Sequence, residues 1–136
     1  MSQENVEIVQ TMWKTAADGD PTLVPVQFLD PEVLYEDEFI PDHAGETYRG
    51  HEGVQRAWTR AIEAFETEPY DNEIQWARDT GDEVVTCHHV RARGKGSGIV
   101  VEFDYAYLWR LRAGKIIYCK AFRDPAQALE AAGLSD

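Results

Sequence analysis

The stretch that decides the fold runs from residue 100 to residue 122 and reads VVEFDYAYLWRLRAGKIIYCKAF. In its first half, charged or small residues alternate with four aromatic ones: Phe103, Tyr105, Tyr107 and Trp109. Side chains of a β-strand point alternately to its two faces, so this alternation predicts a strand whose aromatic face is turned inward. The sequence Ala113-Gly114-Lys115 then predicts a tight turn into a second strand.

Three more strands are expected before this pair. Turn signals at residues 79–82 and 94–98 interrupt runs of β-branched and aromatic residues, so residues 70 to 124 predict four consecutive strands. Links of hairpin length favour antiparallel neighbours over βαβ crossovers. An earlier stretch, Glu32 to Asp37, predicts a further strand, and residues 41 to 50 predict a loop.

Helical periodicity marks the first half of the chain. The clearest helix has apolar side chains at intervals of three and four and ends before Pro69. Its stripe consists of Val54, Ala57, Trp58, Ala61, Ile62 and Phe65. A first helix, ending at Gly19, carries Trp13 on its apolar side.

Two shorter helices are also expected. Asp20-Pro21 has the pattern of a cap and first helical residue, and the helix it predicts would carry Leu23 and Phe28. Asp124-Pro125 predicts a capped helix near the C-terminus, ending at Gly133. Because the helices come first and the sheet second, the chain is assigned to the α+β class.

Length, charge and composition limit the classes of protein. The 136 residues, 43% of them hydrophobic, suffice for one core, so we expect one domain over residues 1–136. A formal net charge of −12 opposes binding to nucleic acid and to anionic membranes. The absence of a signal-peptide pattern and of a long apolar run favours a cytoplasmic protein. Cys87 and Cys119 are expected to be buried thiols, and no metal motif stands out.

Four motifs carry a family resemblance: Tyr48-Arg49-Gly50-x-Glu52-Gly53, Ser97-Gly98, Trp109 to Ile116, and Ala128 to Leu134. With the order of elements, they resemble the SnoaL-like branch of the nuclear-transport-factor-2-like superfamily over nearly the whole chain. The resemblance implies a cone, in which a strongly curved antiparallel sheet wraps around N-terminal helices and encloses a pocket for a small hydrophobic molecule. It also implies a homodimer that pairs through the outer sheet face, where Ala106 and Leu108 are expected. This fold hosts polyketide cyclases, ketosteroid isomerases, epoxide hydrolases and members without a known reaction.

The resemblance draws attention first to the strand before residue 38. Tyr35 and Asp37 share one face of it. Asp37 matches the general base of ketosteroid isomerases, and the two residues match a Tyr and an Asn of epoxide hydrolases. A carboxylate among aromatic neighbours would be a better base than one in water. A role for Asp37 in capping the following loop is the alternative.

A second candidate group lies on the strand around residue 90. Cys87, His89 and Arg91 share one face, and His88 lies on the other. His89 and Arg91 best correspond to a polar pair of the epoxide hydrolases, although the residue types differ. Histidine titrates near neutral pH and arginine can orient a carbonyl, so both are candidate catalytic residues. A slip of one residue would put His88 in place of His89.

The aromatic strand supplies the remaining candidates. Tyr107 matches the position of an oxyanion-hole acid in ketosteroid isomerases, and a phenol can donate the same hydrogen bond. The ligand-binding wall is expected to include Trp13, Trp58, Phe103, Tyr105, Trp109 and Cys119. Core packing is the competing explanation for the aromatic row.

Two positions depart from the family's known mechanisms. Met12 stands where ketosteroid isomerases have an oxyanion tyrosine, and Ala121 where epoxide hydrolases have a working aspartate. Asp124 is three residues later, but its place before Pro125 predicts a helix cap.

These observations favour an enzyme that transfers protons on a hydrophobic, carbonyl-containing or polycyclic substrate, as an isomerase, cyclase or hydrolase, without a cofactor. A non-catalytic module that binds a small hydrophobic ligand is the alternative from another class. The third possibility is a dimer without a known activity, whose aromatic core is dry and contains no accessible cavity.

Overall fold

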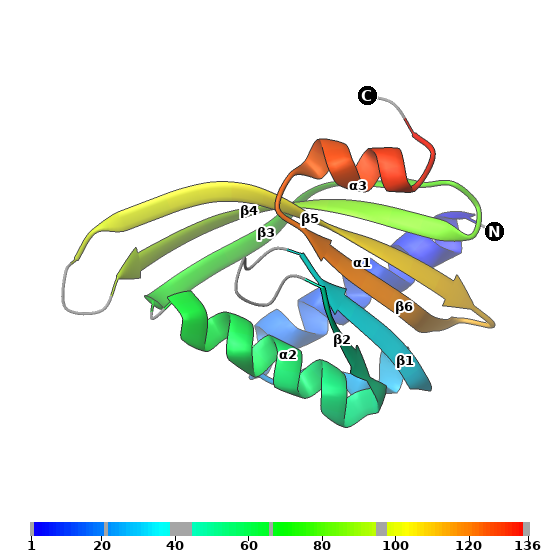
Figure 1. Ribbon diagram of the computed structural model, residues 1–136, viewed down its shortest axis with the longest axis horizontal. Coiled ribbons are helices and arrows are strands. Elements are labelled where there is room, and N and C mark those ends of the chain that lie inside the picture. Colours follow the sequence, from blue (N-terminus) through cyan, green and yellow to red (C-terminus); the bar gives the residue numbers. More distant parts are fainter. Residues whose placement is uncertain (1, 21, 39–44, 66, 95–97, 135–136) are drawn as a thin grey trace.

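The computed structural model describes residues 2–20, 22–38, 45–65, 67–94 and 98–134. Its elements are α1 (Ser2–Asp18), the 3₁₀ turn η1 (Val26–Phe28), β1 (Leu29–Asp37), β2 (Glu46–Arg49), α2 (Gly50–Phe65), β3 (Thr67–Asp79), β4 (Glu83–Gly94), β5 (Val100–Arg112), β6 (Lys115–Phe122) and α3 (Pro125–Ala131). Helices α1 and α2 cover one face of a curved sheet, and α3 packs on the other face (Figure 1).

The six strands form one sheet in the order β2-β1-β6-β5-β4-β3. The four strands expected between residues 70 and 124 are confirmed as β3 to β6, and so is the curved α+β architecture. Neighbouring strands are antiparallel except β1 and β6, which run parallel. The sheet is therefore mixed, because the chain leaves β1 through β2 and α2 and returns beside it only with its last strand.

Register decides which side chains face the helices. Val84, Thr86 and His88 of β4 lie opposite Trp109, Tyr107 and Tyr105 of β5, and residues opposite one another in an antiparallel pair point to the same face. All six side chains are buried, and they lie on the concave face beneath α1 and α2.

The junction between β2 and α2 explains one of the sequence motifs. Gly50 has φ +76°, a conformation that glycine adopts without strain, and it turns the strand directly into the helix. A Cβ on Gly53 would lie 3.1 Å from the carbonyl carbon of Tyr48, so a larger residue there would press against the strand backbone. The loop expected over residues 41 to 50 is thus wrong from Glu46 onward; residues 39–44 lie outside the described part.

The expected second helix is wrong. Asp20 accepts hydrogen bonds from the amide and hydroxyl groups of Thr22, which forms a local turn, and only the short η1 follows. Pro25 has no amide hydrogen to extend a helix. The chain is extended from Leu29, and Pro31 falls where the β1–β6 register shifts.

The C-terminal helix and the thiols follow the sequence predictions. The Asp124 carboxylate accepts a hydrogen bond from the Ala126 amide at 3.0 Å, and Pro125 occupies the first turn of α3. Cys87 and Cys119 are buried free thiols. Within the described residues, no helix combines the length and apolar character that crossing a bilayer requires.

Candidate functional site

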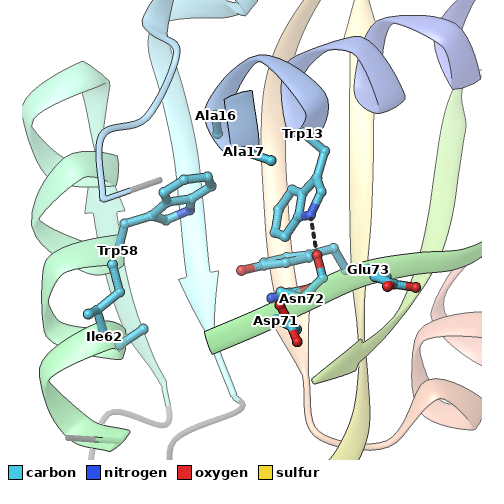
Figure 2. Close-up of a pocket in the computed structure, with 10 residues that line it drawn as sticks. Trp13, Ala16, Ala17, Trp58, Ile62, Asp71, Asn72 and Glu73 are labelled. Carbon is cyan, nitrogen blue, oxygen red and sulfur yellow. Dashed lines mark hydrogen bonds between the residues drawn. The ribbon is translucent and has the colours of Figure 1, made fainter. Parts of the chain in front are cut away.

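A cavity of about 300 Å³ lies between α1, α2 and β3. Three alanines, Ala16, Ala17 and Ala61, help to leave this space open, because their methyl groups reach less far than the side chains around them. The described residues that line it are Trp13, Ala16, Ala17, Trp58, Ala61, Ile62, Asp71, Asn72, Glu73 and Tyr107. Figure 2 shows Trp58 and Ile62 of α2 on one side of the cavity and Asp71, Asn72 and Glu73 of β3 on the other.

Trp13 and Trp58, two of the residues expected in a ligand-binding wall, line the cavity together with Tyr107. The rings of Trp13 and Trp58 meet edge to face, with centroids 5.7 Å apart. The indole nitrogen of Trp13 donates a hydrogen bond to the backbone oxygen of Asn72 at 3.2 Å (Figure 2). This bond fastens α1 to the edge strand β3 and holds the indole at one end of the cavity.

A buried chain of hydrogen bonds runs behind this wall. Trp109 Nε1 donates to Thr86 Oγ1 at 2.9 Å, and Thr86 Oγ1 lies 2.7 Å from His88 Nε2. His88 Nδ1 lies 3.1 Å from Asn72 Oδ1, and Asn72 Nδ2 donates to the Tyr105 hydroxyl at 2.8 Å. Of these five side chains, Asn72 alone also lines the large cavity. It therefore connects the cavity to the buried network.

His88 is neutral in this network. It is 0% exposed, and burial lowers its pKa to about 3. Because Asn72 Nδ2 donates to Tyr105, Asn72 Oδ1 faces the imidazole and accepts a hydrogen bond from His88 Nδ1, while His88 Nε2 accepts one from the Thr86 hydroxyl. Each polar atom of the imidazole is thus paired without a charge.

A second polar group crosses the sheet beside the cavity. Tyr107 lines the cavity, and its phenol is hydrogen-bonded to Tyr35 of β1. Tyr107 and Asp37 both pair with Ala121 of β6, one from each side, so the three lie in one row on the concave face. Asp37 is only 3% exposed. On β6, between the strands that carry Tyr107 and Asp37, this row contains only the methyl group of Ala121.

The surroundings of Asp37 hold nearby acids in their neutral forms. Burial raises the pKa of Tyr35 well above its usual value, and electrostatic repulsion between ionised Tyr35 and the acidic groups of Cys119 and Asp37 adds to this effect. Burial, followed by the charge of Asp37, likewise raises the pKa of Cys119. Both residues line a small hollow of about 10 Å³, which has room for about one water molecule.

His89 and Arg91 do not point into the cavity, so the expectation for this pair is wrong. They lie opposite Asp104 and Glu102 of β5, on the outer face of the sheet. His89 is hydrogen-bonded to Asp104 at 2.7 Å and to Glu102 at 3.1 Å, and these bonds raise its pKa. The alternative register, with His88 inside, is the one observed.

The other predicted wall residues divide into two groups. Trp109 and Cys119 line the small hollow, and Tyr105 and Phe103 pack in the core on the same concave face. None of the four is among the described residues that line the large cavity. The expected positions of Ala106 and Leu108 need a correction as well: they are on the outer face but buried under α3, so they form no exposed dimer surface.

Two residues of the buried hydrogen-bond network were not predicted from the sequence. Thr86 lies on β4, two positions before His88, and Asn72 lies on the edge strand β3. The sequence gives little indication of their role, because a single threonine or asparagine in a strand belongs to no recognisable motif. Among the residues that the structure describes, no three His, Cys, Asp or Glu side chains are grouped to hold a metal ion.

A family model described as "SnoaL-like domain" matches residues 9–119. No curated protein matches the chain. A hypothetical protein with a ketosteroid isomerase-like fold from Catenulispora acidiphila, in complex with trimethylamine, is 25% identical, with a TM-score of 0.68 and coverage of 94% of this chain and 93% of that one.

Two further solved structures resemble the chain in fold. A putative SnoaL-like polyketide cyclase from Jannaschia sp. CCS1 is 17% identical, with a TM-score of 0.74 and coverage of 99% of this chain and 95% of that one. TerC, co-crystallised with polyporic acid, is 18% identical, with a TM-score of 0.71 and coverage of 95% and 97%.

Proposed function

This chain belongs to the SnoaL-like domain family, and we propose that it is an enzyme that transfers protons on a small hydrophobic, carbonyl-containing or polycyclic substrate. One observation carries the proposal. Tyr107 lines the cavity, while its phenol is hydrogen-bonded to Tyr35, which lies within electrostatic range of the buried Asp37. The cavity thus has a hydrogen-bond donor at its wall and a carboxylate in the same row of the sheet.

The proposed step is an isomerisation. The substrate occupies the cavity against Trp13 and Trp58, with its carbonyl oxygen accepting a hydrogen bond from Tyr107. The Asp37 carboxylate removes a proton from the carbon next to the carbonyl, and the electron pair moves onto the oxygen, where the phenol stabilises the charge. Asp37 then returns the proton to another carbon of the conjugated system. No atom is oxidised or reduced, so the step needs no electron carrier.

Tyr35 has a positioning role in this scheme. A tyrosine is already protonated at neutral pH and burial raises the pKa of Tyr35 further, so it remains a neutral hydrogen-bond partner of Tyr107. Ala121 contributes only a methyl group to the row that it shares with Asp37 and Tyr107.

The structural relatives support a small-molecule site. TerC was crystallised with polyporic acid, the Catenulispora protein with trimethylamine, and the Jannaschia protein is described as a putative polyketide cyclase. The aromatic and aliphatic side chains that line the cavity between α1, α2 and β3 suit a small apolar ligand.

A non-catalytic binding module is the second candidate, and one observation favours it. Asp37 is not among the described residues that line the cavity, so a ligand could occupy the cavity without touching the carboxylate. In that case Tyr107 and Asn72 would only orient the ligand.

Binding is tested with 2-tetralone, a bicyclic ketone, by quenching of tryptophan fluorescence, since Trp13 and Trp58 line the cavity. We expect saturable quenching, and its loss in Ala61→Phe, which fills the cavity from α2. Glu63→Phe is the matched control, because Glu63 is exposed on the same helix and lies outside the cavity wall. Equal affinity in both variants would reject this cavity as the site.

Catalysis is tested by exchange of the hydrogens next to the ketone in D₂O, followed by NMR. We expect the wild-type protein to accelerate exchange and Tyr107→Phe to reduce the acceleration by roughly 10² to 10³, the usual effect of losing one oxyanion donor. Binding without accelerated exchange would favour the non-catalytic module.

A further inference from the structure

We propose that Trp13 is the specificity-determining residue of the cavity: its indole closes the inner end and keeps ligands away from His88. This inference rests on the proposed binding of a small apolar molecule in the cavity. It concerns how far that molecule can enter.

The indole of Trp13 has the cavity on one side and His88 on the other. Trp13 lines the cavity, whereas His88 is fully buried and is not among the described residues that line it. The centroids of the two rings are only 4.4 Å apart, with the rings at 62°. Nothing as large as a ligand atom fits between rings at that distance. Trp13 therefore separates the cavity from the imidazole.

Trp13 is held in this place by several contacts. Its ring lies 5.8 Å from that of Tyr107 and 6.5 Å from that of Trp109, in addition to the contact with Trp58. Its indole nitrogen is bonded to the backbone of Asn72 (Figure 2). The indole is thus part of the cavity floor rather than a surface side chain that happens to lie near it.

Removal of the indole would change both the size and the chemistry of the cavity. The space that it occupies would join the existing 300 Å³, and His88 would become part of the wall. In the wild-type protein a ligand does not touch His88 itself but only residues that contact it, namely Asn72 through a hydrogen bond and Trp13 and Tyr107 through their rings. In a variant without the indole, ligand and imidazole would be in contact.

Two probes that differ by one ring measure the depth of the cavity: 2-naphthol and 2-hydroxyanthracene. In the wild-type protein the third ring of 2-hydroxyanthracene must remain toward the solvent side of the cavity, so it should add little to the affinity for the protein. In Trp13→Ala the third ring is buried, and we expect the ratio of the two Kd values to shift in favour of 2-hydroxyanthracene by about tenfold or more. Calorimetry measures both constants without relying on the tryptophan that is removed.

Two further variants isolate the cause. Trp13→Phe keeps a ring over His88 but removes the bond to Asn72, so its affinity ratio should remain close to that of the wild-type protein. Trp58→Ala widens the same cavity from α2 without uncovering His88. In NMR spectra, bound 2-hydroxyanthracene should shift the His88 ring resonances in Trp13→Ala and leave them unchanged in Trp58→Ala.

An unchanged affinity ratio in a folded Trp13→Ala protein, or equal His88 shifts in both alanine variants, would overturn the inference. Trp13→Leu serves the same purpose if the alanine variant does not fold. Failure of 2-naphthol to bind the wild-type protein would instead reject the proposed apolar site. The two failures are therefore distinguishable.

Discussion

Replacement of His88 by glutamine should change how the stability of the protein depends on pH. The folded-state pKa of His88 is about 3, against 6.5 for an unperturbed histidine, because the imidazole is buried. The folded state therefore binds fewer protons than the unfolded state between these two values. The contribution of neutral His88 to stability is present above pH 6.5 and is lost as the pH falls toward 3.

The magnitude follows from the two pKa values. At about 1.4 kcal/mol per pH unit, acidification from pH 6.5 to about 3 costs on the order of 5 kcal/mol, a large part of a typical unfolding free energy of about 5–15 kcal/mol. At pH 7 the glutamine variant should be less stable by about 2 kcal/mol, because the flexible amide differs in shape from the imidazole and does not keep both of its hydrogen bonds, to Thr86 and to Asn72. The two stability curves should therefore cross near pH 5, at about the point where a loss of 2 kcal/mol has accumulated.

The assay is urea unfolding at pH 7, 6, 5 and 4, followed by far-UV circular dichroism. His89→Gln is the control, because the pKa of His89 is raised by Asp104 and Glu102, so its stabilising contribution is present at low pH and lost as the pH rises. Parallel curves for the wild-type protein and His88→Gln between pH 6 and 4 would refute the reasoning. That result would mean that the imidazole leaves the core, or finds a partner, when it is protonated.

Three other predictions concern the assembly, the packing and the thiols. Ile99, just before β5, and Val100 and Val101 at its start expose large apolar side chains, and we expect a homodimer, so that sedimentation at micromolar concentration gives about twice 15.4 kDa; a monomer throughout that range contradicts this. Gly53→Ala forces a methyl group against the backbone of Tyr48, and urea unfolding should show a loss of about 1–3 kcal/mol; an unchanged midpoint would mean that α2 shifts freely. Burial raises the pKa of Cys87 and Cys119, so Ellman's reagent at pH 8 should label the folded protein slowly and the urea-unfolded protein quickly; equal rates would show that the thiols are accessible.

Much of the fold was predictable because its signals are local. The alternation from Phe103 to Trp109 gives the strand β5 and its inward face. The turn after it is equally legible, since Ala113 and Gly114 both have positive φ, the conformation of a two-residue hairpin turn. The Asp124 cap depends on its immediate neighbours alone.

The features that were missed depend on contacts between distant segments. The parallel pairing of β1 with β6 joins residues more than 80 positions apart, and no local pattern encodes it. The orientation of β4 was ambiguous because both faces carry a histidine, at positions 88 and 89. The deciding fact is the register with β5, which places His88 opposite Tyr105 and His89 opposite Asp104.

The candidate site shows the same division. Tyr35, Asp37 and Tyr107 were found through strand alternation and the family resemblance, and the structure places all three on the concave face. Asn72 could not be found in that way. Its importance comes from its place at the sheet edge, where its backbone meets α1 and its side chain meets β4 and β5.

The rate of hydrogen exchange in 2-tetralone with Asp37→Asn tests the central claim most directly. Asparagine keeps the shape of the buried side chain but cannot accept the proton, so the acceleration of exchange should fall by roughly 10² to 10⁴ while the Kd for 2-tetralone stays within about twofold. An unchanged exchange rate would contradict the assignment of Asp37 as the base. Loss of exchange together with loss of binding would contradict it as well, because it would give Asp37 a positioning role.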